Sequence, residues 1–360
     1  MGNKLIPARI VTPGDILSME LEARGWTQKD LAEIMDRPAQ TINAIINAKK
    51  EITPETAIEL AAALGTSAEV WTNLETNYRL HRAKKNADHQ AISRRRRLYE
   101  LVPISELIKR QWLPQTKTLE ELETSVCNFL DIASPTETPK LAVNFRHNHT
   151  LQSEDTALIA WIKRVEHLAK MQSVGKFDRE QLKSAIPKIL SYAQTQENIN
   201  KVPPLLTSLG VHFVIVPHLS KTYLDGATFT INNHPIIALT QRYNRIDSFW
   251  FTLMHELGHI VAGHEGIYLD DLSQLEDNPQ EKEANQLSCD WLIDSNALAE
   301  FVATHSSRFS TKAIEKFAQS QERHPGIIVG RLQYEGKIPY KNHRKYLVKV
   351  DELLTYIDHP

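Results

Sequence analysis

The chain has 360 residues, of which 41% are hydrophobic and 24% are charged, and this length and balance predict two or three globular domains with apolar cores. Its formal net charge of −2 at pH 7 excludes a protein that binds nucleic acid through its overall charge, so any DNA affinity must come from a local surface. The chain has two cysteines, which excludes a disulfide scaffold. It has no apolar run near the ~20 residues of a membrane span and no signal-type segment, so we predict a cytoplasmic protein that does not enter a membrane.

Short helices separated by tight turns are predicted for residues 1–87, which we interpret as the first domain. Thr27 is a good N-cap for a helix that begins at Gln28, a second short helix is predicted over residues 39–47, and Thr53-Pro54 starts another. This spacing is typical of a helix-turn-helix, in which the second helix enters the major groove of DNA.

DNA contacts are predicted at the start of these two helices. Gln40, Thr41 and Asn43 would reach base edges from the second helix, and Gln28 would lie on a phosphate. Residues 1–87 contain eleven Lys or Arg and eleven Asp or Glu, so a monomer offers DNA little positive charge. We therefore expect a homodimer that presents two recognition helices to operator DNA; a small helical protein-interaction domain is the alternative.

Residues 88–103 are polar, contain four consecutive arginines at positions 94–97 and end at Pro103. We interpret them as a solvated linker, with a basic DNA-binding arm as the alternative. Residues 104–200 are predicted to form a helical middle region. Helical apolar periodicity marks four stretches there, which are Ile104–Trp112, Leu119–Leu130, Asp155–Met171 and Asp178–Thr195.

The pattern changes in residues 201–360, where short apolar runs predict strands at Val211–Val216, Ala227–Ile231 and Ile236–Thr240. Helices are predicted to follow at Asp247–Gly263, Pro279–Asp294 and Thr311–Gln321. The fold class is therefore α+β, mainly helical, with a small sheet just before the helix predicted at Asp247–Gly263. We expect Ile236–Thr240 to be the edge strand along which an extended peptide would bind.

The motif that carries chemistry is His-Glu-Leu-Gly-His, from His255 to His259. Two histidines four residues apart share one face of a helix and can bind one Zn²⁺, and Glu256 can take a proton from a water bound to that ion. The surrounding residues are apolar nearly all round the helix, which predicts that it is buried and that its polar residues need partners. The alternative is a structural His/Glu network without metal.

A third ligand must come from elsewhere in the chain. The eleven-residue zinc motif would require His at position 265, which is Glu265, and His264 lies just past the expected helix end at Gly263. Glu281 and Glu283 compete on the next helix, and Glu281 lies nearer the centre of its apolar stripe. We therefore favour Glu281 as the ligand, with two surface carboxylates as the alternative.

Two further roles are assigned around this site. Asn285 lies one turn after Glu281, where its side chain could hydrogen-bond a ligand histidine. Stabilisation of the oxyanion is left open among Tyr243, Arg245, Tyr268 and His264.

Thr27–Leu64 resembles the Xre-type helix-turn-helix, and Ile10–Leu17 together with Ala61–Trp71 resembles the HigA subgroup of antitoxins. That resemblance implies a domain that dimerises on operator DNA and neutralises a toxin. Gly226–Thr228, Asp247–His259 and Glu281–Asn285 resemble the ImmA/IrrE metallopeptidases. That resemblance covers residues 200–300 well and 104–200 loosely.

The second resemblance implies a C-terminal zincin-like domain that is a zinc-dependent peptidase and cleaves a regulator, with His255, His259 and Glu281 as ligands and Glu256 as the base. Two departures concern the later helix: Gln286-Leu287 stands where the family often has Phe-Ala, and Leu292-Ile293-Asp294 where it continues into Leu-Pro. Three hypotheses follow. The chain is a DNA-binding regulator and a peptidase, an antitoxin or repressor with a non-cleaving sensor or scaffold, or a peptidase whose helix-turn-helix recognises a protein. The substrate is a repressor, a cognate toxin or the chain's own linker.

Overall fold

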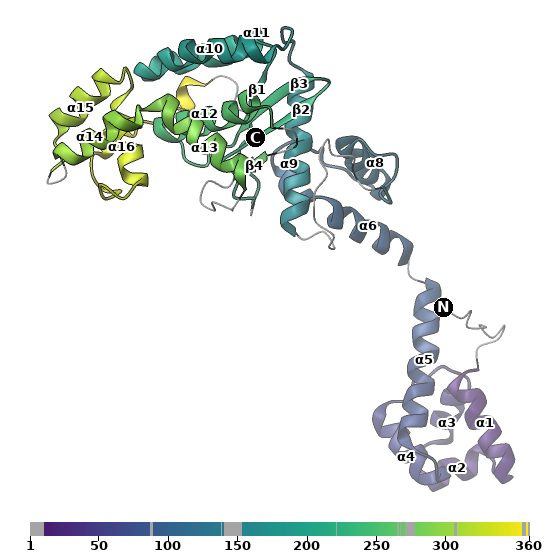
Figure 1. Ribbon diagram of the computed structural model, residues 1–360. Helices are drawn as coiled ribbons and strands as arrows, with labels where there is room; N and C mark the ends of the chain where they lie inside the picture. The colour runs from purple at the N-terminus through teal and green to yellow at the C-terminus, as the bar shows by residue number, and fades with distance from the viewer. Residues whose placement is uncertain are drawn as a thin grey trace. The chain divides into compact units, whose positions relative to one another are not determined.

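The computed structural model describes residues 11–86, 89–137, 139, 153–220, 222–264, 266, 268–270, 278–305, 308–354 and 358. The chain divides into two compact units, Met1–Ser93 and Arg94–Pro360 (Figure 1). Within the described part of the chain, no helix has the length and apolarity needed to cross a membrane.

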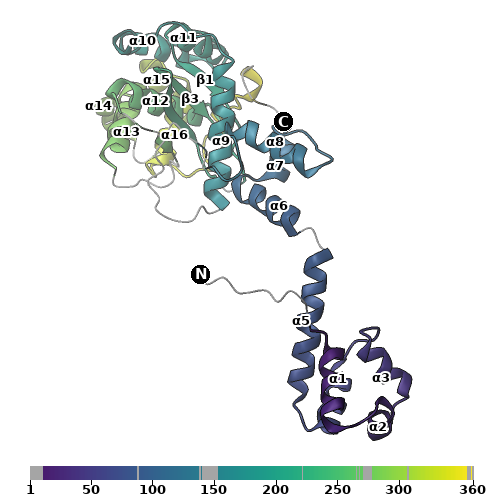
Figure 2. The same cartoon turned by 90° about the vertical axis from the view of Figure 1, so that its right-hand side faces the viewer.

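The first unit consists of short helices, which are α1 (Pro13–Arg24), α2 (Gln28–Ile34), α3 (Ala39–Ile46), α4 (Pro54–Leu64) and the longer α5 (Ala68–Asn86). Their starts follow the predicted capping chemistry, since Thr27 accepts a bond from the amide of Asp30 and Thr53 one from that of Thr56. Leu31, Ile42 and Leu60 are fully buried in one core that joins these helices, so α2 and α3 are held as a helix-turn-helix pair (Figure 2).

The stretch expected to be a linker is largely helical, as α6 (His89–Leu101). Leu98 is fully buried, and Arg94 pairs with Glu120 and Glu123 of α8. Arginine and leucine are good helix formers, so a segment rich in them can be helical even when it is polar. Polar composition alone was therefore an insufficient reason to predict a linker. Arg94, the first residue of the arginine run, therefore forms ion pairs within the second unit.

The predicted middle region contains α7 (Ile104–Lys109), α8 (Leu119–Leu130), α9 (Ser153–Lys170), α10 (Arg179–Ser191) and α11 (Val202–Ser208). Two of these helices, α9 and α10, pack against residues 201–360. Leu182 and Ile189 of α10 are buried in the same apolar cluster as Trp250 and Leu253, and α9 lies beside the sheet, where Trp161 Nε1 donates to the carbonyl of Val216.

Four strands form one sheet in the order β1-β3-β2-β4, from β1 (His212–Ile215), β2 (Gly226–Ile231), β3 (His234–Leu239) and β4 (Tyr268–Asp270). The prediction that Ile236–Thr240 forms the edge strand is wrong. β3 pairs in parallel with β1 and antiparallel with β2, so its backbone is bonded on both sides. β4 pairs with the other side of β2 and forms the edge near the candidate site.

The remaining helices are α12 (Ile246–Ala262), α13 (Pro279–Leu292), α14 (Ser295–His305), α15 (Thr311–Ser320) and α16 (Pro325–Tyr334). α12 packs against β2 and β3 on one side and against α13 and α16 on others (Figure 1). A helix surrounded in this way must be apolar nearly all round, as the sequence analysis predicted. Because α12 contains His255, Glu256 and His259, these residues of the candidate site lie in the protein interior.

Candidate metal centre and helix-turn-helix surface

The polar residues of α12 lie in the protein interior. His255, Glu256 and His259 are each 0% exposed, among fully buried neighbours such as Met254 and Leu257. Gly263 ends the helix in a left-handed conformation, with φ of 77°. Burial of two imidazoles and a carboxylate on one helix is unfavourable unless a partner compensates for the lost hydration.

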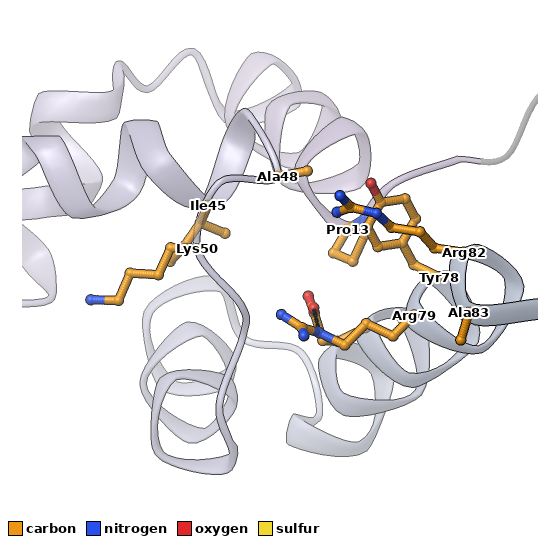
Figure 3. Close-up of a pocket in the computed structure, with 9 residues that line it drawn as sticks. Pro13, Ile45, Ala48, Lys50, Tyr78, Arg79, Arg82 and Ala83 are labelled. Carbon is orange, nitrogen blue, oxygen red and sulfur yellow. Dashed lines mark hydrogen bonds and ion pairs between the residues drawn. The ribbon is translucent and has the colours of Figure 1, made fainter. Parts of the chain in front are cut away.

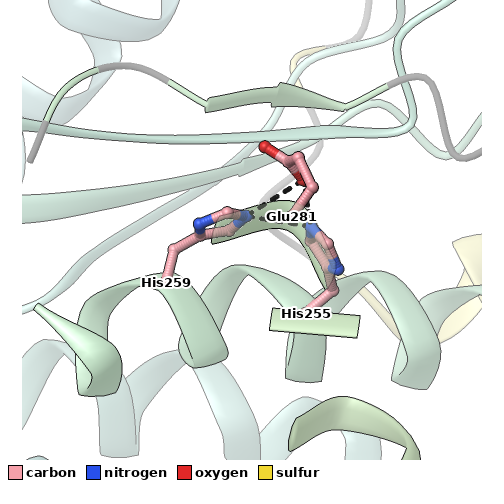
Figure 4. A group of neighbouring side chains, drawn as sticks. All are labelled: His255, His259 and Glu281. Atoms are coloured by element: carbon pink, nitrogen blue, oxygen red, sulfur yellow. Dashed lines mark hydrogen bonds and ion pairs between the residues drawn. The ribbon is translucent and has the colours of Figure 1, made fainter. Parts of the chain in front are cut away.

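Two imidazole nitrogens and one carboxylate oxygen, from His255, His259 and Glu281, converge above this helix (Figure 4). The Nε2 atoms of His255 and His259 lie 3.0 Å apart, and Oε2 of Glu281 lies 3.2 Å from the first and 3.3 Å from the second. The structure therefore brings together the three predicted ligands. Within the described residues they are the group of His, Cys, Asp or Glu side chains arranged to hold a metal ion.

The distances between these atoms fit a zinc ion. In a tetrahedral site with bonds of about 2.0 Å, ligand atoms lie about 3.3 Å from one another. Two imidazole nitrogens and one carboxylate oxygen are also the donor set of catalytic zinc, which leaves a fourth position open. Glu281 is 20% exposed while both histidines are fully buried, so the open side of the site lies toward the carboxylate.

Close approach of α13 to α12 places Glu281 above the histidines. A Cβ atom at Gly258 would lie 3.2 Å from the Cα of Ala284, so only small residues fit where the two helices cross. Asn278 caps the start of α13 by accepting a bond from the amide of Gln280. The site thus depends on a small residue in each helix.

Each of the two predicted ligand histidines has a hydrogen-bond partner on its other ring nitrogen. His255 Nδ1 lies 3.0 Å from Oδ1 of Asn285, the residue predicted for this role. His259 Nδ1 lies 2.9 Å from Nδ1 of His264, whose Nε2 lies 3.2 Å from Oε2 of Glu283. Both contacts are satisfied when Nδ1 of His259 donates to Nδ1 of His264 and Nε2 of His264 donates to Glu283. In that arrangement Nε2 of His259 carries no proton.

The role of His264 was missed in the sequence analysis, which treated it mainly as a helix-end residue. Gly263 was the available signal, because a left-handed residue after a helix turns the next residue back over the last turn. Accordingly, the amide of His264 donates to the carbonyl of His259. Glu283, the competitor for the ligand position, contacts His264 and lies in the outer layer of the site.

Glu256 is held by strand β2. Thr228 Oγ1 donates a hydrogen bond of 2.6 Å to Glu256 Oε2, a contact for which the sequence analysis proposed no role. A Cβ atom at Gly226 would lie 2.2 Å from Glu256 Oε1, so glycine leaves the space that the carboxylate occupies. The two residues fix the carboxylate beside the ligand histidines.

The four candidates for the oxyanion have different surroundings. Arg245 forms two hydrogen bonds to the carboxylate of Asp247, which raise the pKa of the guanidinium. Tyr243 lines a cavity beside α12, and His264 faces His259. Tyr268 lies on β4, and the placement of its side chain is outside the described residues.

The predicted DNA contacts of the first unit lie on α3 and at the start of α2. Gln40 and Asn43 are exposed, while Gln28 and Thr41 are half-buried. Asn43 Nδ2 donates to Oε1 of Gln28 over 3.1 Å, so this pair links α3 to α2. Gln40 and Thr41 are in the first turn of α3, where a recognition helix reaches bases.

A hollow of about 260 Å³ lies at the other end of α3 (Figure 3). Arg79 and Arg82 line it from α5, and Lys50 lines it from the segment after α3. Arg79 pairs with Glu75 and Glu51, which offsets part of this charge. The hollow therefore gathers positive side chains of a unit in which residues 1–87 carry equal numbers of basic and acidic residues.

Comparisons with known proteins match both units. The family model described as helix-turn-helix matches residues 17–71, and that described as IrrE N-terminal-like domain matches residues 207–312. An uncharacterised helix-turn-helix-type transcriptional regulator, YddM of Escherichia coli, is 34% identical over 24% of this chain and 88% of its own length. Antitoxin HigA-1 of Vibrio cholerae is 43% identical over 19% of this chain and 64% of its own length.

One solved structure among the matches is the Pseudomonas aeruginosa antitoxin HigA with the higBA promoter. It is 32% identical, covers 23% of this chain and 90% of its own, and has a TM-score of 0.22. All of the relatives named here match the chain over a quarter of its length or less.

Proposed function

The chain belongs to the Xre-type helix-turn-helix regulators and carries an IrrE/ImmA-like peptidase domain, and on that premise we propose that it binds operator DNA and cleaves a regulatory protein with a zinc-dependent endopeptidase site. The DNA-binding surface is the first turn of α3 with Gln40, Thr41 and Asn43, supported by Gln28. The chain acts as a homodimer, because two such units double a weak electrostatic attraction to DNA.

The catalytic role of Glu256 carries the proposal. A buried carboxylate beside three converging ligand atoms has little structural value, and Thr228 and Gly226 hold it in one position. In the proposed reaction Glu256 accepts a proton from the attacking water and passes it to the nitrogen of the leaving amine. When bound to His255, His259 and Glu281, zinc supplies polarisation of a carbonyl and activation of water at neutral pH.

The test compares the wild type with Glu256→Gln, which keeps the size of the side chain and removes its basicity. Both proteins should bind one zinc ion per chain by elemental analysis. Sequencing of new protein N-termini in cells of the source organism should find one or a few cut sites with the wild type and none with the variant. Identical N-termini in cells with the wild type and in cells with Glu256→Gln, with zinc bound in both proteins, would contradict the proposal.

The second candidate is an antitoxin or repressor whose peptidase-like domain senses or docks without cleaving. The relatives of the first unit favour it, since one is named an antitoxin and another a transcriptional regulator. In that case a cognate toxin is the protein partner, and Glu256→Gln should leave both DNA binding and toxin neutralisation unchanged. New N-termini in wild-type cells that are absent from Glu256→Gln cells support the first candidate, and identical N-termini in the two support the second.

A further inference from the structure

A cavity of about 420 Å³ opens beside the first half of α12. Its lining comes from Ser248, Phe251 and Thr252 of α12, from Tyr334 of α16 and from Tyr340 after that helix. The volume is in the range of pockets that enclose a small ligand or one large side chain. Neither the metal ligands nor the base explains why this space stays open.

Two residues of the cavity lining adjoin residues of the metal centre. Asn285 lines the cavity and also contacts the ring of His255. Thr252 lines it one helical turn before Glu256, and a Cβ atom at Gly226 would lie 2.7 Å from Thr252 Cγ2 and 2.2 Å from Glu256 Oε1. A peptide with its reacting carbonyl near Glu256 would therefore have a neighbouring side chain at the mouth of the cavity.

Aromatic residues dominate the rim. Tyr243, Tyr334 and Tyr340 line the cavity and are 51%, 55% and 64% exposed, and the ring of Phe251 lies 6.2 Å from that of Tyr334. Several exposed aromatic side chains around one concave site are typical of a binding surface, since they bury large areas on contact.

The charged groups in the lining are neutralised within the protein. Arg245 is hydrogen-bonded to Asp247, and Arg331 pairs with Glu335. The buried carboxylate of Asp225, which also lines the cavity, lies 4.0 Å from the guanidinium of Arg242. Asp247 is buried against Gly330, where a Cβ atom would lie 2.3 Å from its carboxylate. An uncharged side chain therefore suits the cavity better than a charged one, which would lose hydration without gaining a free counter-charge.

We propose that this cavity is the specificity pocket of the peptidase and takes an aromatic or long aliphatic side chain of the residue next to the scissile bond. The inference rests on the proposed function, because it needs a peptide bound across the metal centre. It narrows the substrate to proteins with such a residue at the cut site, and makes Ser248, Phe251 and Tyr334 the residues that set this preference.

The test has a binding arm and a cleavage arm. In the binding arm, saturation-transfer NMR with N-acetyl-phenylalanine amide is recorded on the zinc-loaded full-length wild type, Glu256→Gln, Ser248→Phe and Tyr99→Ala. Ser248→Phe fills the cavity from the half-buried face of α12, and Tyr99→Ala removes an exposed tyrosine that does not line it. Ring signals should persist in Glu256→Gln and Tyr99→Ala and fall several-fold in Ser248→Phe.

In the cleavage arm, a peptide library made from a digested proteome is cut by the same proteins and by Tyr334→Ala. The wild type should prefer Phe, Tyr, Leu or Met at one position beside the cut, and Ser248→Phe should lower the ratio of large to small residues there about tenfold. Tyr334→Ala should weaken the preference for aromatic residues. Thermal unfolding of each variant shows whether it is folded.

The outcomes distinguish failure of the pocket proposal from failure of the proposed peptidase function. Equal ring signals in Ser248→Phe and wild type, or a cleavage preference unchanged in both pocket variants, would overturn the pocket proposal even if cleavage occurs. Absence of cleavage by the zinc-loaded wild type, together with ring signals that depend on Ser248, would reject the peptidase and retain a pocket that binds aromatic groups.

Discussion

The hydroxyl of Thr228 donates a 2.6 Å hydrogen bond to the carboxylate of Glu256, and both residues are buried. Because Thr228 is on β2 and Glu256 is on α12, this bond holds the Glu256 carboxylate against the sheet. The proposed metal ligands belong to α12 and α13, so the orientation of the Glu256 carboxylate toward them depends on how the sheet packs under α12.

Thr228→Val keeps the shape of this side chain and removes its donor. Loss of a bond to a buried carboxylate costs about 1–3 kcal/mol, so we expect kcat/KM for peptide cleavage to fall roughly 10–100-fold with unchanged zinc content. Thr228→Ser retains the hydroxyl and should recover most of the activity. Equal activity of the valine variant and the wild type would show that the base does not need this bond.

Glu281→Ala and Glu283→Ala form a matched pair for the third ligand. Glu281 Oε2 lies 3.2 and 3.3 Å from Nε2 of the two histidines, whereas Glu283 Oε2 lies 3.2 Å from Nε2 of His264. Elemental analysis after dialysis should find zinc lost from Glu281→Ala and retained in Glu283→Ala. In competition with a chelator, Glu283→Ala should lose less than the roughly 10–100-fold in affinity that is usual for a direct partner of a ligand, because His264 stands between Glu283 and His259. Retention of zinc by Glu281→Ala would reject the assignment.

Gly226→Ala places a methyl group 2.2 Å from Glu256 Oε1 and 2.7 Å from Thr252 Cγ2. Overpacking of this kind costs about 1–3 kcal/mol, and the carboxylate must move, so we expect a lower melting temperature and little cleavage. Gly336→Ala is the control, because nothing lies within 4 Å of its Cβ and only its φ of +68° is strained, at about 1–2 kcal/mol. It should lose stability but keep its activity per folded molecule.

Gln40→Ala should weaken specific DNA binding by about 1–3 kcal/mol if this side chain reads a base edge from the start of α3. The measurement is fluorescence anisotropy with DNA from upstream of the chain's own gene, against random DNA of the same length at fixed salt. Asn73→Ala, an exposed amide on α5, is the matched control. A loss of equal size on random DNA would assign Gln40 to the phosphate backbone.

His324 should make stability depend on pH. Its Nδ1 accepts the amide of Gly326 at the start of α16, and burial lowers the pKa of its imidazole below the ordinary value of 6.5. The unfolded chain therefore binds more protons just below pH 6.5, and stability falls as the pH drops through this window. His324→Asn keeps a capping acceptor that does not titrate. The decrease in melting temperature between pH 8 and pH 5.5 should be smaller in this variant than in the wild type.

Periodicity and capping in the sequence were sufficient to predict the elements that carry the site. Two histidines four residues apart must share a face of any helix, and the apolar residues around them required that helix to be buried. The preference for Glu281 over Glu283 came from the same angular reasoning, and the structure places Glu281 Oε2 between the two imidazoles. These features depend on local geometry, which a single segment contains.

Strand order, the partners of His259 and the cavity were decided only by the tertiary structure. Ile236–Thr240 has the same apolar pattern whether it is at the edge or in the centre of a sheet, and only its pairing with both β1 and β2 distinguishes the two. The contact of His264 with Glu283 joins residues on either side of β4, and the cavity joins α12 to α16. Contacts between distant segments depend on how the elements pack, and no periodicity within one element records that packing.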